Sequence, residues 1–203
     1  MNDARTKEQG LDQWAEDLIF HQAHTTYAFA DQPVSDEQLA KIYELMRLGP
    51  TAMNSQPLRI HFIRTAEAKA RLLPHLAEGN RAKSQSAPVV AILAADTDFH
   101  LHLERVAPHQ KGARERLAAD DLTRAKDAMF NATLQAGYFI LAARAVGLDA
   151  GPMGGFDKAG IDAELFPGTA LASILVVNLG HASDQGQRPR GVRLELHEAV
   201  RFE

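Results

Sequence analysis

The sequence predicts a single domain that combines helices with strands. Two continuous apolar runs, 87–95 (APVVAILAA) and 173–180 (SILVVNLG), have the length and the β-branched content of strands that are buried on both faces. The stretch 121–146 has helical length and becomes apolar almost all round after Met129, which is typical of a helix buried in a core or against a partner subunit. No linker rich in Pro, Gly or Ser divides the 203 residues, so we treat 1–203 as one domain.

The first well-defined helix is expected to begin after Ser35. Ser35 and Gln38 have the spacing of a capping box, and apolar residues then recur with helical spacing as far as Met46. Gly49 and Pro50 are expected to end this helix.

The segment that follows alternates in the manner of a half-buried strand. Leu58, Ile60 and Phe62 are apolar, and the residues between them are polar. Thr65 can cap a following helix, which we expect to end at Gly79.

Three later segments have no clear helical or strand period. Residues 96–119 are polar and contain three histidines, which is more typical of an inserted excursion or a lid than of a core. Residues 147–157 (GLDAGPMGGFD) are interpreted as a glycine-rich hairpin whose backbone N–H groups can point at one ligand, although a plain helix-to-strand turn explains the same composition. Residues 187–203 are basic and then amphipathic, with too few apolar residues for a core of their own.

Composition excludes several classes of function. The formal net charge of -4 provides no basic face for nucleic acid. The chain has no cysteine, which rules out disulfides, thiolate catalysis and iron–sulfur clusters and fits a reducing compartment. The N-terminus MNDARTKEQG is too polar for a signal sequence, and the apolar stretches 88–95 and 132–146 are too short or too interrupted to span a bilayer. We therefore expect a cytoplasmic protein that binds neither nucleic acid nor membranes.

Four short motifs occur in order along the chain, namely GPTAMNSQP at 49–57, EGNRAK at 78–83, NATLQAGY at 131–138 and GPMGGFD at 151–157. Together with the basic pair Arg190 and Arg193, they make nearly the whole sequence similar to the FMN-dependent nitroreductase family. Within that family, the chain most resembles the branch that includes malonic semialdehyde reductase. The resemblance implies an α+β fold, a nitroreductase-like mixed sheet wrapped by helices, in an intertwined homodimer that binds two flavins at the subunit interface.

The resemblance implies that two segments reach the flavin from the second subunit. The matching residues of the first segment are Pro50, Thr51, Ala52 and Asn54, and Asn54 can also cap a turn. Asn131 matches a polar residue that reaches the other subunit's flavin. On an otherwise apolar helix it can equally satisfy a backbone group, and the sequence leaves both readings open.

The glycine loop matches the segment that lies beside the flavin ring. Pro152 and Met153 correspond to residues against the ring, and the amides of Gly154 and Gly155 correspond to donors to its N5 and O4. Some relatives carry a glutamate where this chain has Gly154, so only the backbone N–H is available here.

Asn80 and Lys83 match the family's asparagine and its cation over the pyrimidine end of the flavin. Two-electron reduction leaves negative charge near N1 and O2 of the ring, and an ammonium group placed there stabilises it. A lone lysine is otherwise most often a solvated surface charge, so this role depends on the resemblance.

The match is weakest where the family grips the flavin phosphate. The family carries a basic patch on its first helix, whereas this chain has AHTTY, with His24, Thr25 and Tyr27 and without the usual arginine and lysine. The resemblance therefore assigns most of the charge neutralisation to Arg190 and Arg193, with hydrogen bonds from His24 and Thr25.

Histidines in the polar excursion suggest two further roles. Pro108 and His109 suit the branch that the chain resembles, and His109 is a candidate to border the substrate. His100 and His102 would share one face of a strand, with Glu104 next along it, which is the spacing of a metal site. The family needs no metal, and we expect none.

The resemblance implies an oxidoreductase in which NADH or NADPH reduces bound FMN and a small-molecule substrate then takes the hydride. A small aldehyde such as malonic semialdehyde is the substrate that the branch suggests, and nitro compounds or quinones are those of the wider family. Because the phosphate grip is altered, a flavin-free dimeric binding or regulatory module of the same fold is the main alternative. A dehydrogenase that uses nicotinamide alone is a weaker one, because its glycine fingerprint is missing.

Overall fold

The computed structural model describes residues 10–185 and 188–203. A four-stranded sheet in the order β1-β2-β4-β3 lies at its centre. The strands are β1 (Leu58–Ile63), β2 (Val89–Asp96), β3 (Asp149–Met153) and β4 (Leu171–Gly180). All three pairings are antiparallel, and parallel pairing among the described residues is confined to an isolated bridge between Thr25 and Ala150. The α+β class is confirmed.

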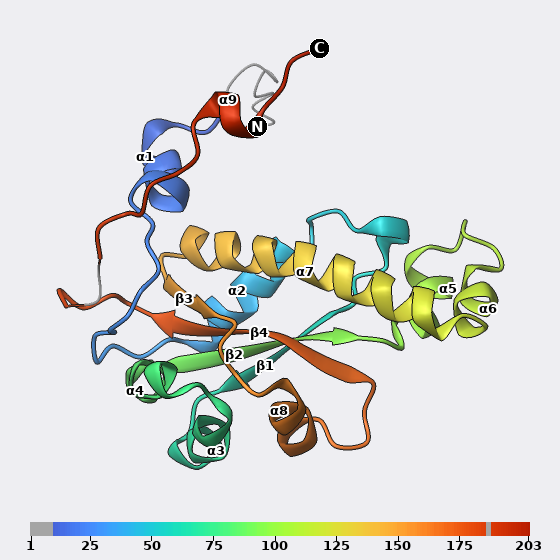
Figure 1. Ribbon diagram of the computed structural model, residues 1–203, viewed down its shortest axis with the longest axis horizontal. Coiled ribbons are helices and arrows are strands. Elements are labelled where there is room, and N and C mark those ends of the chain that lie inside the picture. The colour runs from blue at the N-terminus through green and yellow to red at the C-terminus, as the bar shows by residue number, and fades with distance from the viewer. Residues whose placement is uncertain (1–9, 186–187) are drawn as a thin grey trace.

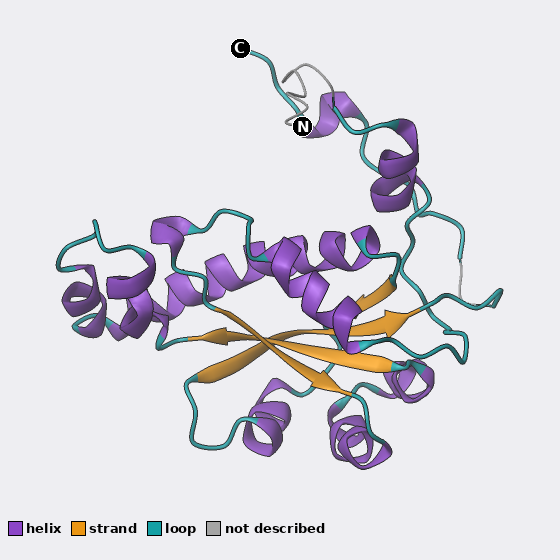
Figure 2. Cartoon of the chain, turned by 180° about the vertical axis from the view of Figure 1, so that it is seen from behind, coloured by secondary structure: helices purple, strands orange, loops and turns teal. Residues whose placement is uncertain are grey.

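Helices cover both faces of the sheet (Figures 1 and 2). On one face lie α2 (Asp36–Met46) and α7 (Asp121–Ala145), and on the other lie α3 (Ala66–Leu72), α4 (Glu78–Ser86) and α8 (Lys158–Leu165). Every residue of β2 is buried, because β2 has a strand on each side and helices above and below. The predicted buried strands and the long helix at 121–146 are confirmed.

Local capping signals set the start of two helices. The Ser35 hydroxyl accepts from the Gln38 N–H, and the Gln38 side chain accepts from the Ser35 N–H, which is the predicted capping box. Thr65 caps α3, as predicted. The expected end at Gly79 is wrong, since Pro74 lacks the N–H that a continuing helix needs and the chain forms the 3-10 helix η3 (Leu73–His75) before α4 begins.

Residues 96–119 fold into three short helices, η4 (Phe99–His102), α5 (Leu103–Val106) and α6 (Ala113–Ala118). Phe99, Leu103 and Leu117 from these helices are buried in the same core as α7. The expectation that this segment lies outside the core is therefore wrong. Its apolar residues are divided among short helices with different axes, so they show no single period in the sequence.

The first half of the glycine-rich segment is a strand and not a loop. β3 lies at the edge of the sheet, where Pro152 costs little because its missing N–H would face away from β4. A Cβ on Gly151 would lie 2.6 Å from the backbone oxygen of Thr26. Glycine at this position therefore lets residues 23–27 pack closely against β3.

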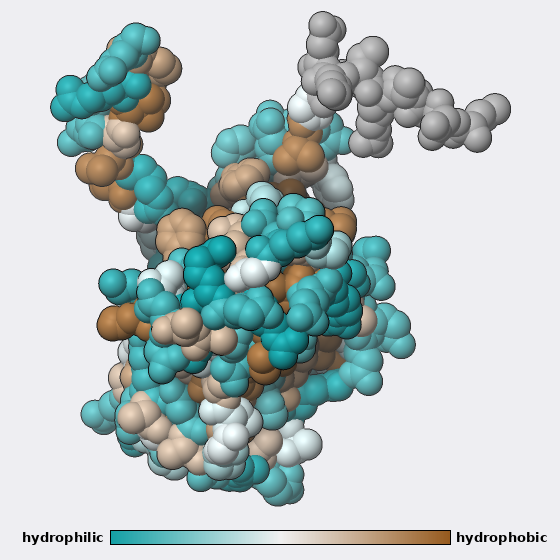
Figure 3. Space-filling view, turned by 90° about the vertical axis from the view of Figure 1, so that its right-hand side faces the viewer, coloured by the Kyte–Doolittle hydropathy of each residue, from teal (hydrophilic) through white to brown (hydrophobic). Residues whose placement is uncertain are grey.

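The two terminal segments stand away from the body (Figure 1). α1 (Gln13–Glu16) and the π-helical turn η1 (Asp17–His21) form the first, and residues 188–203 with α9 (Leu196–Ala199) form the second. Their apolar side chains are largely exposed, with Trp14 at 73% and Val192 at 98%, and Figure 3 shows such brown patches on the projecting segments. Residues 1–9, whose polarity argues against a signal sequence, lie outside the described residues. Within the described part, no helix has both the length and the apolarity to cross a membrane.

Candidate functional site

A small cavity between the N-terminal segment and the C-terminal tail is lined by four arginines. Its volume is about 180 Å³, and Arg144, Arg188, Arg190 and Arg193 surround it. None of the four pairs with a carboxylate in the described part of the chain. The remaining wall includes the three predicted residues His24, Thr25 and Tyr27. We call this cavity the arginine cleft, and the positive charge of its four arginines suits an anion.

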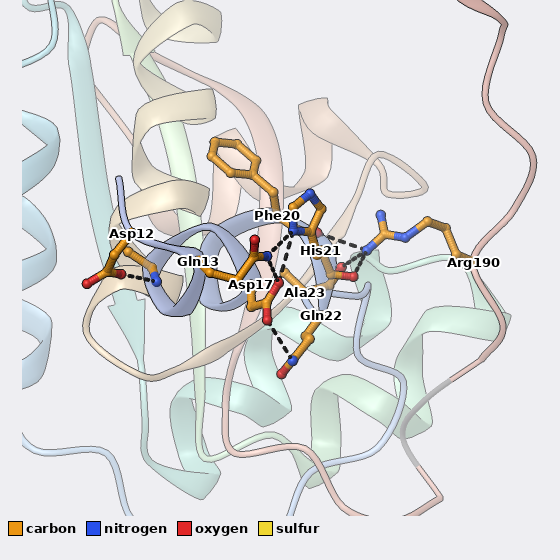
Figure 4. Close-up of polar contacts among 9 residues, drawn as sticks. Asp12, Gln13, Asp17, Phe20, His21, Gln22, Ala23 and Arg190 are labelled. Atoms are coloured by element: carbon orange, nitrogen blue, oxygen red, sulfur yellow. Dashed lines mark hydrogen bonds and ion pairs between the residues drawn. The ribbon is translucent and has the colours of Figure 1, made fainter. Parts of the chain in front are cut away.

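Arg190 fastens the tail to the N-terminal segment, as Figure 4 shows. Its Nη2 donates to the carbonyl oxygens of Phe20, His21 and Ala23 at 2.9, 2.9 and 2.8 Å. The Asp17 carboxylate lies 3.0 Å from His21 Nδ1 and holds the end of η1 in place. The helical turns end at His21, so residues 23–27 do not lie on a helix, and Thr25 forms a bridge with Ala150 of β3.

Arg144 and Arg188 were not among the predicted site residues. Arg144 lies near the end of α7, donates to the Ile19 carbonyl at 3.0 Å and has a buried Nε without a partner. Burial, and then the charge of Arg190, lower the pKa of Arg144. A single arginine that interrupts an apolar helix was the only sequence signal for this residue. Arg188 had no such signal, since it reaches the cleft from an irregular tail.

Lys83, on α4, lies next to the arginine cleft. Its Nζ is 5.2 Å from the centre of the Tyr27 ring, and the Arg188 guanidinium carbon is 4.1 Å from the same ring. Burial, and then the charge of Arg188, lower the pKa of Lys83. Lys83 is half-buried and has no carboxylate partner in the described chain, so it is not an ordinary solvated lysine.

The loop after β3 presents two free amides beside α4. Within the described chain, the N–H groups of Gly154 and Gly155 donate to no protein acceptor, and both residues are exposed. The Gly155 carbonyl accepts from Asn80 Nδ2 at 2.8 Å and from the Ala77 N–H at 3.0 Å, so Asn80 holds the loop. Met153 was expected to lie against the flavin ring, and its side chain packs into the core. Strand alternation turns its side chain into the core, where it is 7% exposed and its Sδ accepts from Ser84.

A second group of predicted residues forms the turn at 50–56, which includes the 3-10 helix η2 (Ala52–Asn54) and which we call the η2 turn. Met53, Asn54 and Gln56 have φ values of 54°, 51° and 44°, and among the described residues they are the non-glycine residues with positive φ. Such backbone is costly for side-chain-bearing residues and persists only where neighbours hold it. The Asn54 side chain donates to the Val106 carbonyl at 2.7 Å, which ties the turn to α5.

Asn131 provides the main support for this turn from α7. Its Oδ1 accepts from the Ala52 N–H at 2.7 Å, and its Nδ2 donates to the Asp127 carbonyl at 2.9 Å. The side chain is 2% exposed. The sequence left two roles open for Asn131, contact with the other subunit's flavin or a hydrogen bond to a backbone group. In the described chain, Asn131 bonds to backbone groups. Hydrogen bonds from other residues hold the start of the turn. Thr51 Oγ1 accepts from the Gln56 N–H, and the Pro50 carbonyl accepts from the Tyr138 hydroxyl.

Replacing Asn131 by leucine is expected to destabilise the chain by about 1 to 3 kcal/mol, because the Ala52 N–H and the Asp127 carbonyl lose the side-chain amide that bonds to both. Urea unfolding measures this free energy. Thr133→Leu is the control, since Thr133 lies exposed on the same helix and bonds only within its own turn. Equal losses in the two variants would contradict the assigned role of Asn131.

The histidines of the excursion do not form a metal site. His100 is 6% exposed and His102 is exposed, because the 3-10 helix η4 directs them differently from the strand that would have placed them on one face. No group of three metal-ligating side chains occurs among residues 10–185 and 188–203. His109 is exposed on the outside of this segment and lines none of the cavities described here.

Comparison with known proteins decides the family. The Nitroreductase family matches residues 21–181 of the chain. The chain belongs to the nitroreductase family. A protein of Leptothrix cholodnii is 54% identical over 189 residues, which are 93% of this chain and 96% of that protein. One of Streptomyces coelicolor is 53% identical over 182 residues, which are 90% of each chain. Both carry the provisional name NADH dehydrogenase/NAD(P)H nitroreductase.

Solved nitroreductases share the fold at low sequence identity. A provisionally named nitroreductase of Exiguobacterium sibiricum in complex with FMN has a TM-score of 0.81 and 21% identity, with 96% of this chain and 99% of that chain covered. One of Bacillus subtilis has a TM-score of 0.77 and 22% identity, covering 91% and 97%. These likenesses confirm the nitroreductase fold.

In this nitroreductase the candidate residues fall on two faces of the sheet. The η2 turn rests against α5 and α7, whereas Asn80 and Lys83 lie on α4, which covers the opposite face (Figures 1 and 2). The sequence motifs thus form two separate clusters within one chain.

Proposed function

We propose that this nitroreductase is an FMN-dependent NAD(P)H oxidoreductase that acts on small oxidised molecules as a homodimer. The observation that carries the proposal is the arginine cleft, which lies next to Lys83. Its four guanidinium groups, none of which forms an ion pair in the described chain, fit a phosphate. Lys83 and the free amides of Gly154 and Gly155 fit a ring that gains negative charge on reduction. The likeness to a structure that contains FMN supports this assignment.

When bound, FMN would supply the hydride chemistry, which no side chain here provides. Arg190 and Arg193 would hold the phosphate, with Arg144 and Arg188 adding charge from α7 and the tail. Lys83 would keep its proton and stabilise the negative charge of the reduced ring, and Asn80 would keep the glycine amides in position. NADH or NADPH is the reductant that the names of the curated relatives suggest.

The flavin-free alternative depended on the missing cations of the N-terminal motif. Arg144 and Arg188 supply two cations at the same place from other parts of the chain. This arrangement favours a protein that binds FMN.

Exposed apolar surface supports the homodimer. Phe130 on the outer side of α7 is 69% exposed, Leu48 beside the η2 turn is 78% exposed, and Phe202 on the tail is 85% exposed. A second copy would cover such side chains. It would also bring the η2 turn of one chain to Lys83 and the glycine amides of the other, since within one chain the η2 turn rests against α5 and α7 whereas Lys83 lies on α4 across the sheet. The substrate would then meet residues from both subunits, and we propose a small aldehyde of the malonic semialdehyde type, with nitro compounds and quinones as further acceptors.

FMN titration of two tail variants tests the cleft. Arg193→Gln should weaken FMN binding by about 10- to 100-fold, because a charge-assisted contact to phosphate is lost. The matched control is Arg201→Gln, which removes a tail arginine outside the cleft and should bind FMN as the wild type does. Quenching of flavin fluorescence gives the dissociation constants. Identical constants for all three proteins would refute the phosphate assignment, and sedimentation of the loaded protein as a monomer would refute the dimer.

A further inference from the structure

A second, larger cavity lies on the α2 and α7 side of the sheet, and no residue of the arginine cleft contributes to it. Its volume is about 420 Å³. Its floor is the edge strand β1, through Leu58, Ile60 and Phe62, and its rim carries Arg47 and Arg105. The cavity therefore joins an apolar floor to a cationic rim.

Ser55 lies in the wall of this cavity and has an unused hydroxyl. The residue is 3% exposed, and its Oγ is buried without a hydrogen-bond partner. A buried hydroxyl is costly unless a partner reaches it, and Ser55 is one of the residues that line the cavity. The hydroxyl thus points to a ligand that brings a hydrogen-bond acceptor.

The charges around the rim indicate the sign of that ligand. Arg59 is already neutralised, because its Nη2 lies 2.5 Å from Asp96 Oδ2. Arg105 pairs with no carboxylate in the described chain, and neither does Arg47, which stacks on the Tyr43 ring at 5.6 Å. Two free guanidinium groups above an apolar floor match a carboxylate attached to a short apolar or aromatic body.

We propose that this cavity binds the carboxylate of the oxidised substrate. Ser55 and Gln56 are the last two residues of the η2 turn, and both line the cavity. A ligand held in the cavity therefore contacts the turn that the proposed function places at the flavin of the second subunit. The inference rests on that proposed function and narrows it to small carboxylate-bearing aldehydes or nitro compounds. Arg105 and Ser55 hold the carboxylate. The residue that segment 96–119 contributes to the carboxylate site is thus Arg105 and not His109.

Calorimetric titration with benzoate tests the cavity without any reaction. Wild-type protein is expected to bind benzoate, and Arg105→Gln should weaken binding by about 10- to 100-fold. Ser55→Ala should weaken it by roughly 5- to 10-fold. It should not lower the unfolding midpoint of the ligand-free protein, since its Oγ has no partner to lose. The matched control is Arg116→Gln, an exposed arginine on α6 outside the cavity. Failure of benzoate to bind, or equal binding by all variants, would overturn the proposal.

Turnover by the FMN-loaded protein separates this inference from the function on which it rests. The ratio of kcat/KM for 4-nitrobenzoate to that for nitrobenzene should fall at least about tenfold in Arg105→Gln and stay unchanged in Arg116→Gln. Reduction of both compounds with an unaltered ratio would overturn the carboxylate site and leave the oxidoreductase intact. Reduction of neither would overturn the proposed function, and benzoate binding would still decide the cavity. Weakened dimerisation of Arg105→Gln without any effect on benzoate would assign the cavity to a segment of the second copy and overturn the proposal.

Discussion

Replacing Gly151 by alanine is expected to lower the free energy of unfolding by about 2 to 3 kcal/mol. The new Cβ would lie 2.6 Å from the Thr26 carbonyl oxygen, and both are atoms that move only with the backbone. The contact is also where the Thr26 N–H donates to the Ala150 carbonyl at 3.1 Å, which holds residues 23–27 against β3. Relief of the clash would displace the segment that carries His24 and Tyr27, so FMN affinity should fall with stability. Urea unfolding and FMN titration measure the two effects.

Gly154→Ala is the matched control, three residues further along the chain. A Cβ on Gly154 meets no atom within 4 Å, and the residue does not have a positive φ. Its stability should therefore change by less than about 1 kcal/mol, with a gain expected from the lower entropy of the unfolded chain. If both alanine variants lost stability equally, the close approach at Gly151 would not be the cause.

Replacing Lys83 by methionine is expected to lower the reduction potential of the bound flavin. A charge-assisted contact of about 2 kcal/mol to the reduced ring corresponds to roughly 40 mV for a two-electron couple. Reduction by NADH or NADPH should slow in parallel. Lys83→Arg keeps the charge and should recover most of the potential. Photometric titration of the flavin measures it, and an unchanged potential in Lys83→Met would return this lysine to a surface role.

The effect of Lys83 should also depend on pH. Burial and Arg188 lower the pKa of Lys83, so the ammonium loses its proton at a lower pH than an ordinary lysine does. The difference in potential between wild type and Lys83→Met should therefore be full near neutral pH and shrink as the pH rises into the alkaline range. Arg188→Gln removes one of the two causes and should move this decline to higher pH. A difference that stays constant with pH would show that Lys83 does not titrate beside the flavin.

Three helices and three strands could be predicted because their signals lie close together in the chain, namely α2, α3, α7, β1, β2 and β4. The Ser35 capping box and the alternation of Leu58, Ile60 and Phe62 are patterns of neighbouring residues, and the structure reproduces both. The helix α4 was missed because its apolar content is low and it is held from outside. Lys69 of α3, for example, donates to the Gln85 and Ala87 carbonyls at the end of α4. Support of that kind leaves no periodic pattern in the supported segment.

Some features of the candidate site could likewise be predicted from neighbouring residues, and others depended on the fold. Short motifs were enough to locate the η2 turn, the α4 pair Asn80 and Lys83, and the glycines after β3, because each motif is contiguous. Whether each side chain faces a ligand or the core depended on the fold. Met153 turns inward because β3 pairs with β4, and Asn131 reaches Ala52 across 79 residues of sequence. Arg144 and Arg188 meet only because the end of α7 and the tail pack against one N-terminal segment. Contacts between distant residues are set by packing, and a pattern of neighbouring residues carries no information about them.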